Sequence, residues 1–257
     1  MQLKAQYHAF TTILIKEVMR FVRIWVQTVL PAGITMALYF IIFGNLIGSQ
    51  LADVHGQRYI DYIVPGIILM AVINNSYANV VSSFFSAKFQ RHVEEMLVSP
   101  MPNYLILSGF VAGGVARGLV VGAVVTVVAS FFVDLKITHL LITLMVLLMT
   151  SILFALAGFI NAVYAKTFDD ISIIPTFVLT PLTYLGGVFY SIDMLPGFWQ
   201  SLSLGNPILY MVNAMRYGML GVADINVITA LVIIIAFVVT LFSFALWLLN
   251  RGVGVRS

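Results

Sequence analysis

The sequence predicts an all-α membrane protein, and its composition carries that prediction. Of the 257 residues, 61% are hydrophobic and only 9% are charged. Ordinary soluble domains carry about 25% charged residues and about 45–50% apolar ones. A soluble fold of this size could not bury so much apolar surface, so a chain this apolar needs lipid around it. The net charge is +3, with Lys and Arg concentrated at particular points, which indicates membrane topology and no nucleic-acid partner.

Residues 1–23 are predicted to form an amphipathic helix that lies in the membrane interface. Apolar residues recur there at steps of three and four: Leu3, Tyr7, Phe10, Leu14, Val18 and Phe21. Charged and polar residues fill the other faces, as in interfacial helices. A helix packed on the rest of the protein at the soluble side is the alternative. The segment lacks the apolar core and cleavage site of a signal peptide.

Six stretches are long and apolar enough to cross roughly 30 Å of hydrocarbon as helices. They are Trp25–Ile47, Tyr62–Phe84, Ile106–Val133, Leu140–Tyr164, Ile173–Phe189 and Val227–Asn250. Pro and Gly interrupt the segment 191–224, which is too broken for another simple span. We expect two short helices there, Leu195–Ser203 and Pro207–Leu220, because Asn206-Pro207 has the form of a helix cap followed by a first-turn proline.

The basic residues predict that both termini are cytoplasmic. With the N-terminus inside, nine basic residues lie on the inner side and three on the outer side, a clear positive-inside bias. The nine are Lys4, Lys16, Arg20, Arg23, Lys88, Arg91, Lys166, Arg251 and Arg256, and the three are Arg58, Lys136 and Arg216. Arg117 falls within the third span, where it must face protein, water or a carboxylate. Two roles for Arg117 remain open: a charge that is partnered inside the bundle, or a contact with substrate.

No catalytic or metal site is recognisable in the sequence. It contains no phosphate-binding loop for ATP, no zinc helix, no nucleophile elbow and no cysteine. The acidic residues lie at or beyond the span ends, which argues against proton or sodium coupling. Asp169 and Asp170 are the only acid pair for an enzyme acting on lipid-linked sugar. Adjacent residues point in different directions on a helix, so we interpret them as a cap and interface charges.

The loop 86–103, on the cytoplasmic side, is predicted to contain a short amphipathic helix. Apolar residues repeat there at helical steps, namely Phe85, Phe89, Val93 and Met96, and Pro100 ends the helix. Such a helix has the right shape for a groove on a partner protein. The alternative is a helix that lies on the membrane and only links two spans.

Glycines in the third span predict close helix packing. Gly114, Gly118 and Gly122 follow one another at steps of four, and Gly109 and Gly113 form a second such pair. Residues four apart share a helix face, and a stripe of small residues lets two helix backbones approach closely in lipid. The motif does not say whether the neighbouring helix belongs to the same chain.

Aromatic residues crowd the region before the last span. They are Tyr184, Phe189, Tyr190, Phe198, Trp199, Tyr210 and Tyr217. An aromatic belt at the membrane–water interface accounts for such a group. The sharper hypothesis is a platform at an exit, on which sugar rings or lipid-linked cargo stack.

The longest pattern begins in the fifth span as Leu179-x-x-Leu182-x-x-Leu185-Gly186-Gly187-Val188. It continues with Leu195-Pro196, then Pro207-Ile208-Leu209-Tyr210, with Arg216 six residues after Tyr210. This pattern resembles the signature of ABC-2 type transport permeases. The sequence is similar to a bacterial branch that includes nodulation-factor exporters and inner-membrane permeases of unassigned cargo. The signature positions are Gly186, Leu195, Pro196, Pro207, Tyr210 and Arg216.

The resemblance implies one transmembrane domain over residues 1–257, with an interfacial helix at 1–23, six spans, a coupling helix in 86–103 and an extracytoplasmic re-entrant hairpin at 191–224. It implies a homodimer in the bacterial inner membrane, with two copies of a separate ATPase subunit that binds ATP and Mg, and no cofactor in this chain. The residues implied in coupling are Phe89, Arg91, Glu94, Glu95, Leu97 and Pro100. The cargo would be an exported amphipathic, glycan or drug-like compound, and the alternative is a stand-alone secondary transporter or channel.

Overall fold

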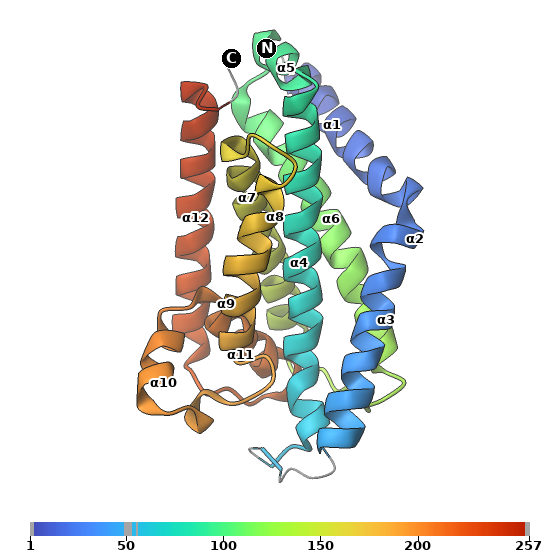
Figure 1. Ribbon diagram of the computed structural model, residues 1–257, viewed down its shortest axis with the longest axis vertical. Coiled ribbons are helices and arrows are strands. Elements are labelled where there is room, and N and C mark those ends of the chain that lie inside the picture. The colour runs from blue at the N-terminus through green and yellow to red at the C-terminus, as the bar shows by residue number, and fades with distance from the viewer. Residues whose placement is uncertain (1–2, 49–52, 55, 255–257) are drawn as a thin grey trace.

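The computed structural model describes residues 3–48, 53–54 and 56–254, and every named element within those ranges is a helix. Five helical segments there are long and apolar enough to cross a membrane. They are Trp25–Gly44, α4 (Tyr59–Phe89), α6 (Asn103–Ala129), α7 (Leu140–Tyr164) and α12 (Val227–Arg251). All five run lengthwise through the molecule (Figure 1), which confirms the all-α membrane class. The predicted boundaries agree with these helices to within a few residues.

The predicted span Ile173–Phe189 is a shorter and irregular helix. It comprises α8 (Asp170–Ile174), the π-helical η3 (Pro175–Leu179) and α9 (Thr180–Leu185). Pro175 lacks an amide hydrogen and so disturbs the regular ladder, and Gly187, with φ of +72°, follows the end of the helix. At 1.5 Å per residue the segment is about 24 Å long, less than the roughly 30 Å of hydrocarbon. A sixth crossing therefore stays a prediction.

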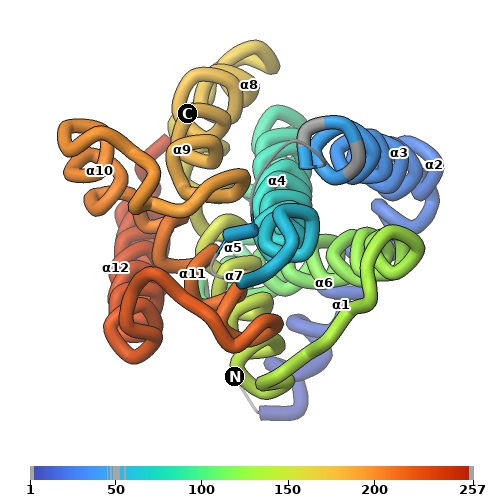
Figure 2. The backbone as a smooth tube through the Cα atoms, turned by 90° about the horizontal axis from the view of Figure 1, so that it is seen from below, coloured from blue at the N-terminus to red at the C-terminus, as the bar shows by residue number. Residues whose placement is uncertain are grey.

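Helix α4 is the central element of the bundle. Most of its side chains are buried, and it packs against α6, α7 and α11. Figure 2, seen along the bundle, places α4 between the α1–α3 side and the α8–α9 side. Its 31 residues extend about 46 Å, longer than the hydrocarbon thickness. One helix thus connects α5 at one end of the molecule with residues 191–224, here called the hairpin, at the other. That this hairpin re-enters the membrane stays a prediction.

Helix α1 (Leu3–Arg23) packs along α6 through a face that only partly coincides with the predicted apolar stripe. Its buried residues are Ile13, Glu17 and Phe21, whereas Leu3 and Tyr7 are exposed. The chain continues as α2 (Trp25–Thr28), α3 (Leu30–Tyr39) and the π-helical η1 (Phe40–Ile47). The position of α1 at the membrane interface stays a prediction.

The two ends of α4 carry different connections. At one end, α5 (His92–Val98) follows after a turn at Gln90 and Arg91, so the predicted helical repeat is divided between two helices. At the other end lie η4 (Ile192–Met194), α10 (Gly197–Leu204) and α11 (Pro207–Leu220). The Asn206 side chain accepts a hydrogen bond from the Ile208 amide at 3.0 Å, which confirms the predicted helix cap.

Candidate functional site

The residues expected to couple to a partner gather at the α5 end of α4. Phe89 is the last residue of α4 and is 63% exposed. Arg91 forms the turn with φ of +62°, a left-handed conformation that is uncommon outside glycine. Helix α5 then carries Glu94, Glu95 and Leu97, and Pro100 follows it. Because Val93 is buried, α5 rests on the bundle with an exposed outer face.

Lys88, one of the nine basic residues predicted on the cytoplasmic side, fixes this turn. The Lys88 ammonium donates to the carbonyl oxygens of Val163 at 2.6 Å and Ala165 at 2.7 Å, at the C-terminus of α7. Those carbonyls have no partner within their helix, and a cation near them is favoured by the helix dipole. The end of α4 is therefore tied to the end of α7. No local pattern could indicate this contact, because the partners are 75 and 77 residues away.

The segment between α7 and α8 also contributes to this end. The Phe168 ring lies 5.2 Å from that of Phe89, between ring centroids. The Asp170 carboxylate accepts hydrogen bonds from the amides of Lys166 at 2.8 Å and Thr167 at 2.9 Å. These bonds favour the ionised form and lower the pKa of Asp170 below its usual value. This geometry suits the interpretation of Asp170 as a cap.

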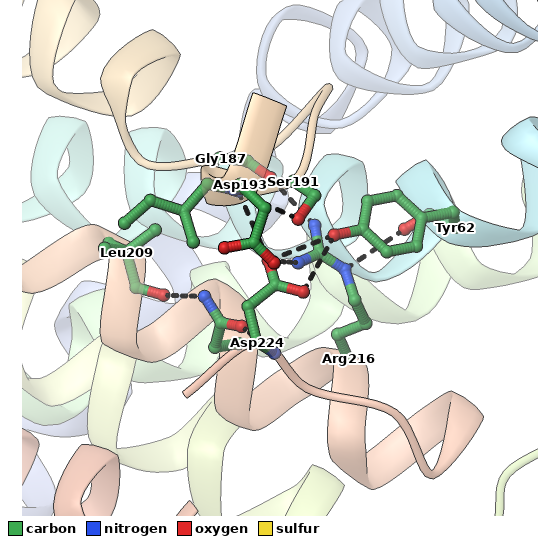
Figure 3. A network of polar contacts seen from close by, with 9 residues as sticks. Tyr62, Gly187, Ser191, Asp193, Leu209, Arg216 and Asp224 are labelled. Carbon is green, nitrogen blue, oxygen red and sulfur yellow. Dashed lines mark hydrogen bonds and ion pairs between the residues drawn. The ribbon is translucent and has the colours of Figure 1, made fainter. Parts of the chain in front are cut away.

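At the hairpin end, a buried network surrounds Arg216 of α11 (Figure 3). The guanidinium lies 3.8 Å from the centre of the Tyr62 ring on α4 and donates to the Gly187 carbonyl at 2.8 Å. One of its nitrogens is 3.5 Å from a carboxylate oxygen of Asp224. The side chains of both charged residues are essentially inaccessible, at 0% and 2% exposure. A buried cation of this kind is tolerated only when it is paired, as it is here.

Asp224 completes the network from the loop after α11. Its carboxylate accepts hydrogen bonds from the Tyr62 hydroxyl at 3.2 Å and from the Ile192 amide at 3.3 Å. Its own amide donates to the Asn213 side chain at 2.9 Å. Four segments therefore meet here: α4, the connection after α9, α11 and the connection to α12. Arg216 was expected on the outer side and as a signature position, and the sequence did not indicate Asp224 or Tyr62 as its partners.

The other signature residues lie around this network in supporting positions. A Cβ on Gly186 would lie 2.6 Å from Ile208 Cγ2, so only glycine allows α9 and α11 this approach. Pro207 begins α11, and the Tyr210 hydroxyl donates to the Leu204 carbonyl at 2.7 Å, which joins α11 to α10. Leu195 and Pro196 lie between η4 and α10, and neither is among the hydrogen-bond or ion-pair partners of Arg216 in the part of the chain that the structure describes.

The aromatic residues of the hairpin region separate into several groups. Phe189 contacts Phe43 at 4.7 Å, Tyr39 at 5.8 Å and Tyr184 at 6.0 Å, between ring centroids, which links the first apolar segment with the end of α9. By contrast, Phe198 and Trp199 are exposed on α10, and Tyr217 stacks on His139. The seven aromatic residues therefore do not form a single stacking platform in this fold.

The glycines of α6 face helices of the same chain. A Cβ on Gly114 would lie 2.5 Å from Val80 Cγ2, one on Gly122 would lie 2.7 Å from Val72 Cγ2, and one on Gly118 would overlap Ser76 Oγ. All three contacts are with α4. A Cβ on Gly109 would lie 2.6 Å from Ile13 Cγ2 on α1. The stripe thus fits between α4 on one side and α1 on the other.

A cluster of charges, which the sequence did not indicate, lies between α1, α4 and α6. Glu17 is 0% exposed, and a carboxylate oxygen lies 3.5 Å from Arg20 Nε. Arg20 donates to the backbone carbonyl and side-chain oxygen of Asn79 at 2.7 and 2.9 Å. Arg117 donates to the side-chain oxygen of Asn75 at 3.0 Å. The signal available in the sequence was the position of Glu17 four residues from both Ile13 and Phe21, on one helix face.

Comparison with known proteins adds independent findings. Residues 8–220 match the family described as ABC-2 type transporter. The inner membrane transport permease YadH of Escherichia coli (strain K12) is 55% identical over 249 residues, which cover 97% of both chains. Nodulation protein J of Rhizobium leguminosarum bv. viciae is 25% identical over 218 residues, 83% of each chain. Nodulation protein J of Rhizobium meliloti (strain 1021) is 24% identical over 185 residues.

Proposed function

The chain belongs to the ABC-2 type transporter family, and from that premise we propose that it is the membrane subunit of an exporter driven by a separate ATPase. Family membership makes it a transmembrane transport subunit and confirms the resemblance inferred from the signature. The proposal adds that two ATPase subunits bind ATP and Mg and act on a homodimer of this chain. It also places the complex in the bacterial inner membrane with both termini cytoplasmic. The cargo is an amphipathic, glycan or drug-like compound.

The observation that carries this proposal is the continuity of α4. At one end it leads into the exposed α5 and is tied to α7 through Lys88, and at the other end Tyr62 contacts Arg216. A packed helix about 46 Å long transmits displacement rather than absorbing it, because protein interiors are densely packed. Force applied to α5 would therefore reach the hairpin end without any catalytic group in this chain.

The exposed surface around α5 has the chemistry of a docking site. Phe89 and Val98 are 63% and 87% exposed, large values for apolar side chains, and the charged residues Arg91 and Glu95 are exposed beside them. Exposed apolar groups rimmed by charge mark protein interaction sites. We assign this surface to the ATPase subunit, with Phe89, Arg91, Glu94, Glu95, Leu97 and Pro100 as its contact region.

The test is purification of the tagged chain from a bacterial host, with identification of an accompanying subunit that has a phosphate-binding loop. The complex is then assayed in liposomes for ATP hydrolysis. Replacement of residues 91–97 by a Gly/Ser linker, and the single change Glu95→Lys, should lower ATP hydrolysis or lose the subunit. Lys136→Glu, an exposed change near the hairpin end, is the matched control and should do neither. Normal assembly and coupling of both α5 variants would contradict the assignment.

A stand-alone secondary transporter or channel is the alternative, and the burial of Glu17 favours it. A buried carboxylate between helices is the feature that ion-coupled transporters use. Here, however, it is paired with Arg20. Uphill transport by the purified chain in ATP-free liposomes, lost in Glu17→Gln, would support the alternative and overturn the ATP-driven proposal.

A further inference from the structure

The cluster of Glu17, Arg20 and Arg117 contains one more positive charge than negative charge. Glu17 is fully buried and faces Arg20 at 3.5 Å, so those two charges compensate one another. Arg117 has no such partner within the described residues. Its recorded hydrogen bond is to the neutral Asn75 side chain, and its Nε is buried without an acceptor. An unpaired charge in low dielectric is costly, so the site is incomplete as the chain alone presents it.

The charge of Arg117 cannot be solvated by water at the membrane surface. It is 14 residues from the start of α6 and 12 residues from its end. At 1.5 Å per residue these separations are about 21 Å and about 18 Å, beyond the reach of an arginine side chain. Residues close to a helix end can extend to the interface, and Arg117 is not one of them.

A second copy of this chain cannot supply the missing carboxylate either. The sequence has ten Asp and Glu residues, and nine of them lie at the two ends of the bundle. At one end are Asp53, Asp61, Asp134, Asp193 and Asp224, and at the other are Glu94, Glu95, Asp169 and Asp170. A partner related by an axis along the membrane normal presents the same residues at the same depths. Only Glu17 lies at the level of the cluster, and it is buried inside its own protomer.

Arg20 of α1 and Arg117 of α6 contact the same face of α4. Arg20 bonds to Asn79 and Arg117 bonds to Asn75, two residues one helical turn apart and so on the same side. The Arg20 side chain is 31% exposed, and Arg117 and Asn75 are half-buried. The exposed part of the Arg20 side chain gives a ligand an approach to the cluster from outside the protomer, and the two amide side chains hold the guanidinium groups in place. Two guanidinium groups present the donors that suit a phosphate or carboxylate.

We propose that Arg20 and Arg117, held by Asn79 and Asn75, bind the anionic headgroup of an amphiphile, a phosphate or carboxylate attached to an apolar tail. An amphiphile suits a site within the bundle because it combines a charge for the guanidinium groups with a tail that stays in the surrounding lipid. The ligand is either a resident anionic phospholipid or the transported compound, and the same chemistry serves both. The proposal concerns binding alone. The binding proposal can fail while ATP-driven transport holds, and ATP-driven transport can fail while binding holds.

The experiment follows thermal unfolding of the purified full chain in neutral maltoside detergent during titration with dodecyl phosphate. The wild type should gain stability in a saturable manner. Arg117→Gln and Arg20→Gln should weaken the apparent affinity about ten- to a hundredfold, the effect of losing hydrogen bonds to a charged group. Arg251→Gln, at the exposed end of α12, controls for general charge effects and should respond like the wild type. An unchanged response of Arg117→Gln, or no response of the wild type, would overturn the proposal.

Two further measurements separate the sources and guard against misfolding. In lipid nanodiscs, saturable preference for phosphatidylglycerol over phosphatidylcholine would assign the site to a resident lipid. Binding of dodecyl phosphate that phosphatidylglycerol does not displace would assign it to the cargo. An equal response to inorganic phosphate would contradict the requirement for an apolar tail. Without ligand, Arg117→Gln should unfold at or above the wild-type temperature, because it loses an uncompensated charge; a lower temperature would show that the charge is already compensated within the protein.

Discussion

The Tyr62 ring lies 3.8 Å from the guanidinium of Arg216, a contact between residues 154 positions apart that joins α4 to α11. The same guanidinium pairs with Asp224 and donates to the Gly187 carbonyl. Arginine over an aromatic ring is a favourable arrangement, and it is stronger where water is excluded. The signature pattern therefore encodes a buried junction that holds the hairpin on the central helix.

Removal of either charge from this junction should destabilise the protein strongly. Arg216→Gln leaves Asp224 as an uncompensated buried carboxylate, and Asp224→Asn leaves the guanidinium unpaired, so each should cost about 3–5 kcal/mol of unfolding free energy. Reversible unfolding in detergent measures the loss. The double variant should lose less than the sum of the two, because no charge is left alone.

The exposed pair Arg58–Asp61 provides the control for that prediction. Its carboxylate and guanidinium meet at 2.7 Å, but the Arg58 side chain is 62% exposed. Exposed ion pairs contribute about 0–1 kcal/mol, so Arg58→Gln should hardly alter stability. Equal effects of Arg58→Gln and Arg216→Gln would mean that burial does not govern these pairs.

Gly118→Ala should destabilise folding because the added methyl group would overlap Ser76 Oγ on α4. Overpacking of this kind costs about 1–3 kcal/mol, and Gly118→Leu should cost more. Ser76→Ala in the same chain should recover part of the loss, because it removes the nearest atom. The measurement is the unfolding temperature in detergent.

Gly33→Ala is the matched change in another apolar helix. A Cβ there would lie 3.7 Å from Val124 Cγ1, an ordinary van der Waals contact. We expect it to leave the unfolding temperature nearly unchanged. If Gly118→Ala and Gly33→Ala behave alike, α4 and α6 do not approach as closely as described.

Lys88→Met should loosen the α5 end of the molecule while the rest of the bundle stays intact. The change removes the charged donor to the Val163 and Ala165 carbonyls, and hydrogen bonds to charged groups contribute about 1.5–3 kcal/mol. Hydrogen exchange should quicken in α5 and in the last turn of α7, and ATP-coupled transport should fall. Lys88→Arg should retain most protection, whereas unchanged exchange in Lys88→Met would refute this role.

The carboxyl of Asp170 should titrate below its usual pKa, since amide hydrogen bonds favour the ionised form. A lowered folded-state pKa means that its contribution to stability is complete above the unfolded-state pKa, about 3.9, and is lost as pH falls through the folded value. Carboxyl NMR of the detergent-solubilised protein, assigned by difference with Asp170→Asn, measures the midpoint. A midpoint at or above the usual value would contradict the cap.

Features that depend on neighbouring residues along the chain could be predicted from the sequence. The length of an apolar stretch decides whether a helix can cross lipid, and this rule located α4, α6, α7 and α12. Helix caps are equally local, so Asn206 could be identified before α11 was known. The signature was also readable, because its spacing is a property of the chain order. The family followed from it.

Which side chains meet depends on how distant segments pack, and this could not be predicted from the sequence. Glu17 is buried because the face of α1 that packs on α6 only partly coincides with its apolar repeat, and Lys88 donates to acceptors at the end of α7. Arg216 was assigned only to the outer side by charge counting, yet it is buried against Tyr62 and Asp224. The periodicity of apolar residues indicates which face of a helix is apolar, but it does not indicate which other helix packs against that face. In lipid every apolar face is acceptable, so the choice of partner depends on close packing and on pairing of charges between distant segments.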